Sequence, residues 1–173
     1  MNDYVAAILF FLPAGVANMS PMIANRLPVI KDWNTPLDFG KTWDGKRVLG
    51  DNKRLRGLLF GTLMGGITAV IVSKLNSNTV VTIDPFWAGC LLGFGALMGD
   101  AVESFFKRRR NIAPGQSWFP FDQTDYIVGG LVLIYPFVPL PVWVITTIIV
   151  VYFGLHLVVA YLAYLLGLKD QPI

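Results

Sequence analysis

Charged residues are scarce in this chain. Only 14% of its 173 residues are charged and 54% are hydrophobic, whereas roughly a quarter of the residues in an ordinary soluble domain are charged. A soluble protein of this length needs more polar surface than these residues supply. We therefore exclude a typical cytosolic globule and predict an integral membrane protein.

Cysteine and histidine each occur once, as Cys90 and His156. A single cysteine cannot form a disulfide within the chain, and the two residues are too few for zinc ligation or thiol redox chemistry. His156 lies alone in an apolar run, where we expect a packed or hydrogen-bonded side chain. The net charge of +3 is unevenly placed, so we predict no nucleic acid as a partner, and nothing in the sequence predicts a protein partner.

Long apolar runs are abundant. A bilayer core about 30 Å thick needs roughly 20 apolar residues of helix, and five stretches reach or approach that length: residues 4–27, 57–75, 85–106, 126–140 and 142–166. Prolines at 139 and 141 favour a tight reversal between the last two, although one long kinked segment is the alternative. The predicted fold is all-α: a single polytopic transmembrane catalytic domain over residues 1–173, with about five transmembrane helices.

The basic residues mark one side of the membrane. Eight of the 14 Lys and Arg residues lie in residues 26–56 and four in residues 107–110. Since positive residues that flank spans stay cytoplasmic, we expect cytoplasmic loops at about 28–56 and 107–123, a cytoplasmic C-terminus and an outside N-terminus. Nine of the 11 acidic residues fall on the same side, which topology does not require. This predicts an active site on the cytoplasmic face of the cell membrane.

Small residues recur at every fourth position in the second and third apolar stretches. Such spacing lets two membrane helices approach closely, so we expect these two helices to pack together. The glycines concerned are Gly57, Gly61 and Gly65 in the second stretch, and Gly89 with Gly93 and Gly95 with Gly99 in the third.

Two pairs of carboxylates, each three residues apart, flank the second basic loop. Asp100 and Glu103 share a helix face at the end of the third stretch, and Asp122 and Asp125 repeat the spacing at the start of the fourth. Hard oxygen ligands of this kind suit Mg²⁺, so all four are candidate metal ligands, with Asp100 and Asp125 the strongest. Alternatively, Asp122 caps the fourth helix and Glu103 pairs with Lys107.

The basic residues near these carboxylates are candidates for binding phosphate, because guanidinium groups hold phosphate oxygens in forked pairs. Read alone, residues 107–110 are a stop-transfer anchor. The first loop mixes glycines with basic residues and hydroxyls, as phosphate-cradling loops do, but Thr35 stands where a P-loop needs its first glycine. The candidate nucleotide-binding residues are Lys41, Thr42, Lys46, Arg47, Lys53 and Arg108.

The same residues resemble a known signature. The motifs are Gly99-Asp100, Glu103-Ser104, Lys107-Arg108, Pro114-Gly115 and Asp122-x-x-Asp125. They are similar to the GDxxESxxKR, PG and DRxD elements of the CTP:phosphatidate cytidylyltransferases (CDP-diglyceride synthases). With five spans and the 41–57 loop, essentially the whole chain resembles the archaeal branch, the CDP-archaeol synthases. The bacterial PGHGG reads Pro-Gly-Gln-Ser-Trp here, and Gln123 replaces the arginine.

This resemblance implies transfer of a cytidylyl group from CTP to 2,3-bis-O-(geranylgeranyl)-sn-glycerol 1-phosphate, an isoprenoid glycerol ether lipid phosphate held in the lipid bilayer. Pyrophosphate would be released and Mg²⁺ would be the cofactor. Asp100, Asp125 and Lys107 are then the expected catalytic residues. The alternatives are a small ion or metabolite transporter, whose polar sites lie near mid-span, and another membrane lipid phosphotransferase.

Overall fold

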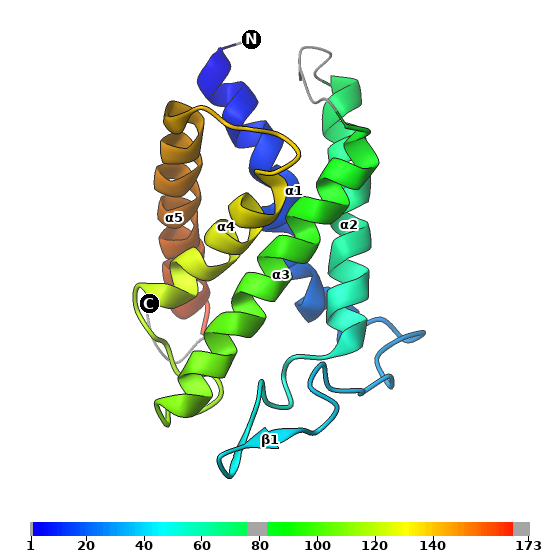
Figure 1. Cartoon of the computed structure of the whole chain (residues 1–173), viewed down its shortest axis with the longest axis vertical. Helices are drawn as coiled ribbons and strands as arrows, with labels where there is room; N and C mark the ends of the chain where they lie inside the picture. The colour runs from blue at the N-terminus through cyan, green and yellow to red at the C-terminus, as the bar shows by residue number, and fades with distance from the viewer. Residues whose placement is uncertain (1, 76–82, 168–173) are drawn as a thin grey trace.

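The computed structural model describes residues 2–75 and 83–167, and five helices make up most of this part of the chain (Figure 1). The expected C-terminal segment, residues 168–173, lies outside the described residues. The helices are α1 (Asp3–Ala24), α2 (Leu55–Leu75), α3 (Pro85–Arg109), α4 (Phe121–Ile134) and α5 (Val142–Leu165). A short antiparallel hairpin, β1 (Thr42–Trp43) with β2 (Lys46–Arg47), lies between α1 and α2. The predicted all-α membrane fold is confirmed.

Helix α4 is shorter than the sequence predicts. Helices α1, α2, α3 and α5 are long and apolar enough to cross a membrane, but the 14 residues of α4 span only about 21 Å at 1.5 Å per residue. It ends at Ile134 instead of residue 140 because Pro136 follows, and proline has no backbone N–H to continue the helical hydrogen bonds. Figure 1 shows the chain continuing from α4 to the start of α5 at the other end of the bundle. The two are separate helices, not one kinked segment.

Helix α3 is the centre of the bundle and packs against α1, α2 and α4. Its contact with α2 is backbone to backbone: a methyl group on Gly89 would lie 2.4 Å from the Gly65 carbonyl oxygen. The predicted close packing of the second and third apolar helices is therefore confirmed. The other glycine pair of α3 faces α4 instead, since a methyl group on Gly95 would lie 2.5 Å from the Gly129 carbonyl oxygen.

The apolar core lies where α1, α3, α4 and α5 meet. Phe11, Leu92 and Ile127 are fully buried there. Two tyrosines place their hydroxyls in this core and satisfy them on backbone carbonyls: Tyr152 donates to Ile8 at 2.7 Å, and Tyr126 donates to residue 152 at 3.0 Å. Because buried polar groups are costly without partners, these bonds fix α5 against α1 and α4.

The two basic loops lie at one end of the bundle, opposite the N-terminus and next to the end of α5 (Figure 1). They also contact each other. The Arg109 guanidinium donates to the Trp43 carbonyl at 2.6 Å, and Lys46 Nζ donates to the Arg109 carbonyl at 3.4 Å. The hairpin is thereby fixed to the end of α3.

The glycine contact between α2 and α3 predicts a steric cost. In Gly89→Ala, the new methyl group must push α2 away, and overpacking of this kind costs about 1–3 kcal/mol. We expect a lower melting temperature in detergent. Gly154→Ala on α5 is the matched control, because a methyl group there meets no atom within 4 Å. A melting temperature equal to that of the parent in Gly89→Ala would contradict the close packing.

Candidate active site

A polar cavity of about 330 Å³ opens at the end of the bundle that carries the basic loops. Its walls come from α1, from residues 49–53 of the first loop, from the last turns of α3, from the start of α4 and from α5. Ionisable side chains line most of it. The cavity therefore gathers residues that lie more than 100 positions apart in the sequence.

Three carboxylates converge in this cavity. Asp100, Glu103 and Asp125 each offer one oxygen, and these oxygens lie within 4.8 Å of one another. The approach of α4 to α3 depends on Gly99, where a methyl group would lie 2.2 Å from the Asp125 carbonyl oxygen. A donor set of three clustered carboxylate oxygens fits a hard divalent cation such as Mg²⁺.

The fourth predicted metal ligand, Asp122, is not part of this group. Its Oδ1 lies 2.5 Å from Lys107 Nζ, and its Oδ2 accepts a hydrogen bond of 3.0 Å from the Trp118 backbone N–H. Asp122 thus ties the first turn of α4 to the loop before it, but it does not cap the helix, since the N-cap residue is Pro120 and the Trp118 N–H lies before the helix begins. It still lines the cavity.

Lys107 is a buried cation between two acids. Its side chain is 11% exposed, and its Nζ lies 3.2 Å from Glu103 Oε1 as well as 2.5 Å from Asp122. The same Nζ donates to the Gln116 carbonyl at 2.9 Å. The Glu103–Lys107 ion pair, considered as an alternative role for Glu103, is present, and Glu103 also belongs to the group of three carboxylates. Lys107 therefore acts as more than a membrane anchor.

Lys53 brings the first loop to the carboxylates. Its Nζ lies 2.5 Å from Asp100 Oδ2. Arg108 lines the same cavity, so the structure places Lys53, Lys107 and Arg108 around one space. These three are the predicted phosphate-binding residues that the fold brings together.

The other predicted phosphate ligands lie on the hairpin and do not line this cavity. Lys41 and Thr42 are exposed. Lys46 reaches the end of α3 instead, and Arg47 is paired with Asp38 and Asp51. Their contact with a nucleotide stays a prediction.

Some lining residues were missed by the sequence reasoning. Asn18 of α1 and Asn52 of the first loop line the cavity, as does Ser104 of α3, which the sequence analysis named only as part of a motif. The one available signal for Asn18 was a polar side chain within an apolar run. His156, expected to be packed, stacks near Tyr126 with ring centroids 5.8 Å apart and also lines the cavity.

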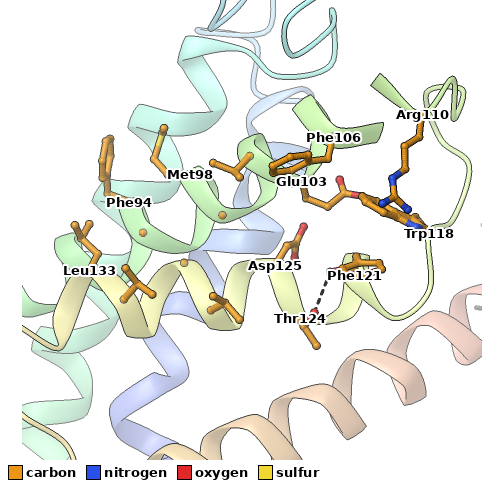
Figure 2. Close-up of a pocket in the computed structure, with 16 residues that line it drawn as sticks. Phe94, Met98, Glu103, Phe106, Arg110, Trp118, Phe121, Thr124, Asp125 and Leu133 are labelled. Carbon is orange, nitrogen blue, oxygen red and sulfur yellow. Dashed lines mark hydrogen bonds between the residues drawn. The ribbon is translucent and has the colours of Figure 1, made fainter. Parts of the chain in front are cut away.

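A second, apolar cavity of about 770 Å³ follows the seam between α3 and α4 (Figure 2). Phe94, Met98 and Leu133 line one end of this groove, as Figure 2 shows. Glu103 and Asp125 lie at its polar end and belong to both cavities. The carboxylate cluster therefore lies where a polar space meets an apolar one.

The residues at the polar end of the groove are held by stacking. The Arg110 guanidinium carbon lies 4.9 Å from the centre of the Trp118 ring, and Trp118 in turn lies 4.3 Å from Phe121, centre to centre. Figure 2 shows these side chains beside the carboxylates. Arg110 belongs to the basic run 107–110 considered for phosphate, but it was not among the candidate nucleotide-binding residues.

Comparison with known proteins now gives the family. The family model described as "CarS-like: CDP-archaeol synthase" matches residues 1–173. The chain belongs to the CDP-archaeol synthase family. It is 40% identical to the CDP-archaeol synthase of Thermofilum pendens, covering 99% of this chain and 82% of the relative, and 37% identical to that of Pyrococcus furiosus, covering 99% of both.

A solved structure agrees. It is described as "an intramembrane enzyme for archaeal membrane lipids biosynthesis", and it matches with a TM-score of 0.76 and 30% identity over 90% of this chain and 92% of that chain. The resemblance found in the sequence motifs is therefore confirmed. The fold of that intramembrane enzyme extends over nearly the whole molecule.

The buried cation predicts a stability effect in this CDP-archaeol synthase family member. Lys107→Met leaves the buried Glu103 and the half-buried Asp122 without their shared cation, and removing one partner of a buried ion pair costs about 3–5 kcal/mol. We expect a clear drop in melting temperature. Lys74→Met removes an exposed lysine from α2 and should melt like the parent. Equal melting of the two variants would show that Lys107 does not stabilise the site.

Proposed function

We propose that the chain is a single transmembrane catalytic domain that transfers CMP from CTP to 2,3-bis-O-(geranylgeranyl)-sn-glycerol 1-phosphate. The products are the CDP-activated diether lipid and pyrophosphate. One observation carries the proposal: Glu103 and Asp125 line both the polar cavity and the apolar groove. A site that joins a soluble triphosphate to a lipid phosphate needs such a junction.

The polar cavity suits the nucleotide. Lys53, Lys107 and Arg108 line it, and cations of this kind neutralise phosphate oxygens. The groove suits the acceptor, because its lining is almost entirely apolar and it runs along α3 and α4 toward the carboxylates. The lipid then enters sideways from the bilayer while CTP enters from the aqueous side.

The reaction requires positioning and charge neutralisation more than proton transfer. An oxygen of the lipid phosphate attacks the α-phosphorus of CTP in line, and the bond to the β-phosphate oxygen breaks. No general base is needed, because a phosphate is already ionised at neutral pH. Lys53 and Arg108 would orient the triphosphate, and Lys107 would hold Glu103 in place.

Asp100, Glu103 and Asp125 would hold Mg²⁺. Bound there, the ion would neutralise phosphate charge as two anions approach each other. Asp122 is the weaker candidate, since Lys107 and the Trp118 N–H already bind its oxygens. We further propose an outside N-terminus and a cytoplasmic site, which the basic loops beside the cavity support.

The metal assignment predicts a loss of turnover without loss of fold. In Asp100→Asn and Asp125→Asn, the size is kept and the charge is removed, so CMP transfer from labelled CTP should fall by orders of magnitude. The melting temperature should stay close to that of the parent. Excess Mg²⁺ should restore part of the activity.

The competing reading is purely structural. If the Lys53–Asp100 pair only joins the loop to α3, Asp100→Asn should lower the melting temperature and leave turnover per folded molecule intact. Asp84→Asn is the control: Asp84 caps α3 at the far end by accepting from the Phe86 N–H at 2.9 Å, and asparagine caps equally well. Full activity of Asp100→Asn and Asp125→Asn at limiting Mg²⁺ would end the metal assignment.

The groove predicts a selective effect on the lipid. Val132→Trp fills part of the groove and takes space that the lipid chain would occupy, so the KM for the lipid phosphate should rise about tenfold, which corresponds to about 1.4 kcal/mol of lost binding. The KM for CTP should not change. Val158→Trp on α5 replaces a similarly exposed valine, outside both cavities, and should behave like the parent. Comparable turnover of water-soluble glycerol 1-phosphate would contradict the lipid groove.

A further inference from the structure

Asp38 is a buried carboxylate in the first loop, away from both cavities. Its side chain is 2% exposed. Oδ1 accepts hydrogen bonds from Arg47 Nη2 at 2.7 Å and from the Gly40 N–H at 3.0 Å, and Oδ2 accepts from the N–H groups of Leu49 at 2.9 Å and Gly50 at 3.2 Å. Both oxygens are thus fully used by the loop itself.

The carboxylate is ionised at neutral pH. Burial opposes ionisation, but the bonds from Arg47 and from the three backbone N–H groups outweigh it and lower the pKa of Asp38 to about 2. A charge is needed here because four donors point at one side chain. An amide in its place would offer one accepting oxygen and turn an NH₂ group toward backbone N–H donors.

The segment that Asp38 holds is a wall of the polar cavity. Residues 49–53 line this cavity. At the start of this segment, Asp38 accepts hydrogen bonds from the Leu49 and Gly50 N–H groups. At the end of the segment, the Lys53 carbonyl accepts a hydrogen bond of 2.7 Å from the N–H of Leu37, the neighbour of Asp38. The wall is therefore fixed at both ends by adjacent residues, 37 and 38.

Each end of the segment 49–53 lies at a cationic side chain that lines the polar cavity. Gly50 has φ +93°, and a methyl group on it would lie 3.9 Å from Arg108 Cδ, so its backbone passes beside that side chain. At the other end, Lys53 reaches Asp100. A shift of this wall would move Lys53 relative to the carboxylates and open the space beside Arg108.

We propose that Asp38 is a positioning residue for the nucleotide: by binding the Leu49 and Gly50 N–H groups it sets the wall of residues 49–53 on which CTP rests. The inference rests on the proposed function, because it assigns the polar cavity to CTP. Asp38 itself contacts no substrate. Its effect on the reaction passes through Gly50 and Lys53.

The test is Asp38→Asn in the full chain, in detergent. Loss of an outer partner of a metal ligand costs about 10–100-fold in affinity or activity; we expect an effect of the same order for this wall, so the KM for CTP should rise about tenfold or more. The KM for the lipid phosphate should stay within twofold, because the groove is formed by α3 and α4. Amide hydrogen exchange should accelerate in peptides covering residues 47–54 and stay unchanged in α5.

Asp32→Asn is the matched control, since Asp32 is an exposed acid of the same loop that lines neither cavity. It should match the parent in both measurements. An unchanged KM for CTP in Asp38→Asn would overturn the inference, whether or not exchange accelerates. So would an equal rise of the KM for both substrates, which indicates general loosening of the fold.

Failure of the proposed function gives a different result. A parent chain that transfers no CMP to the lipid phosphate would refute that function. Hydrogen exchange needs no substrate and still decides whether Asp38 holds residues 49–53: unchanged exchange in Asp38→Asn would refute the positioning role by itself.

Discussion

Mutual repulsion among the carboxylates of Asp100, Glu103 and Asp125 is the constraint on which the rest of the site depends. Their oxygens lie within 4.8 Å of one another at the edge of an apolar bundle, where isolated charges are costly. Two of the three have a cation within ion-pair distance. Lys107 supplies one from the same helix as Glu103, and Lys53 supplies another from the first loop. The first loop thus supplies positive charge that stabilises the carboxylates of the bundle.

Close helix packing is what forces the carboxylates together. Gly99 lets the backbone of α4 touch α3 beside Asp125, and one turn further Gly95 does the same for Gly129. The two helices cross closely there, and the apolar groove follows the same seam. A single set of small residues therefore creates both the acidic cluster and the surface along which an apolar chain can lie.

The sequence could predict what is encoded locally. The spacing of Asp100 and Glu103 and the glycine repeats indicate helix faces, and the structure confirms those helices. The end of α4 was missed because Pro136 outweighed the apolar run that continues past it. Arg47 was predicted as a phosphate ligand from charge alone, but its partner Asp38 lies nine residues away across a loop fold. A contact between two loop residues leaves no periodic pattern in the sequence, so the sequence could not identify Asp38 as the partner of Arg47.

The basic residues divide into two groups, those whose bonds maintain the loop structure and those that can release their partner to bind a ligand. Arg47 and Arg109 are bound by loop carboxylates and backbone carbonyls, so their bonds maintain the shape of the site. Lys53 is bound by Asp100, a member of the acidic cluster. The Lys53–Asp100 ion pair can separate without leaving either charge uncompensated only if an anion binds Lys53 and a cation binds Asp100. A nucleoside triphosphate arriving with the proposed Mg²⁺ brings both charges, whereas either one alone leaves a half-buried charge without a partner, since the Lys53 and Asp100 side chains are 22% and 30% exposed. The electrostatics of the cavity thus favour joint binding of nucleotide and metal.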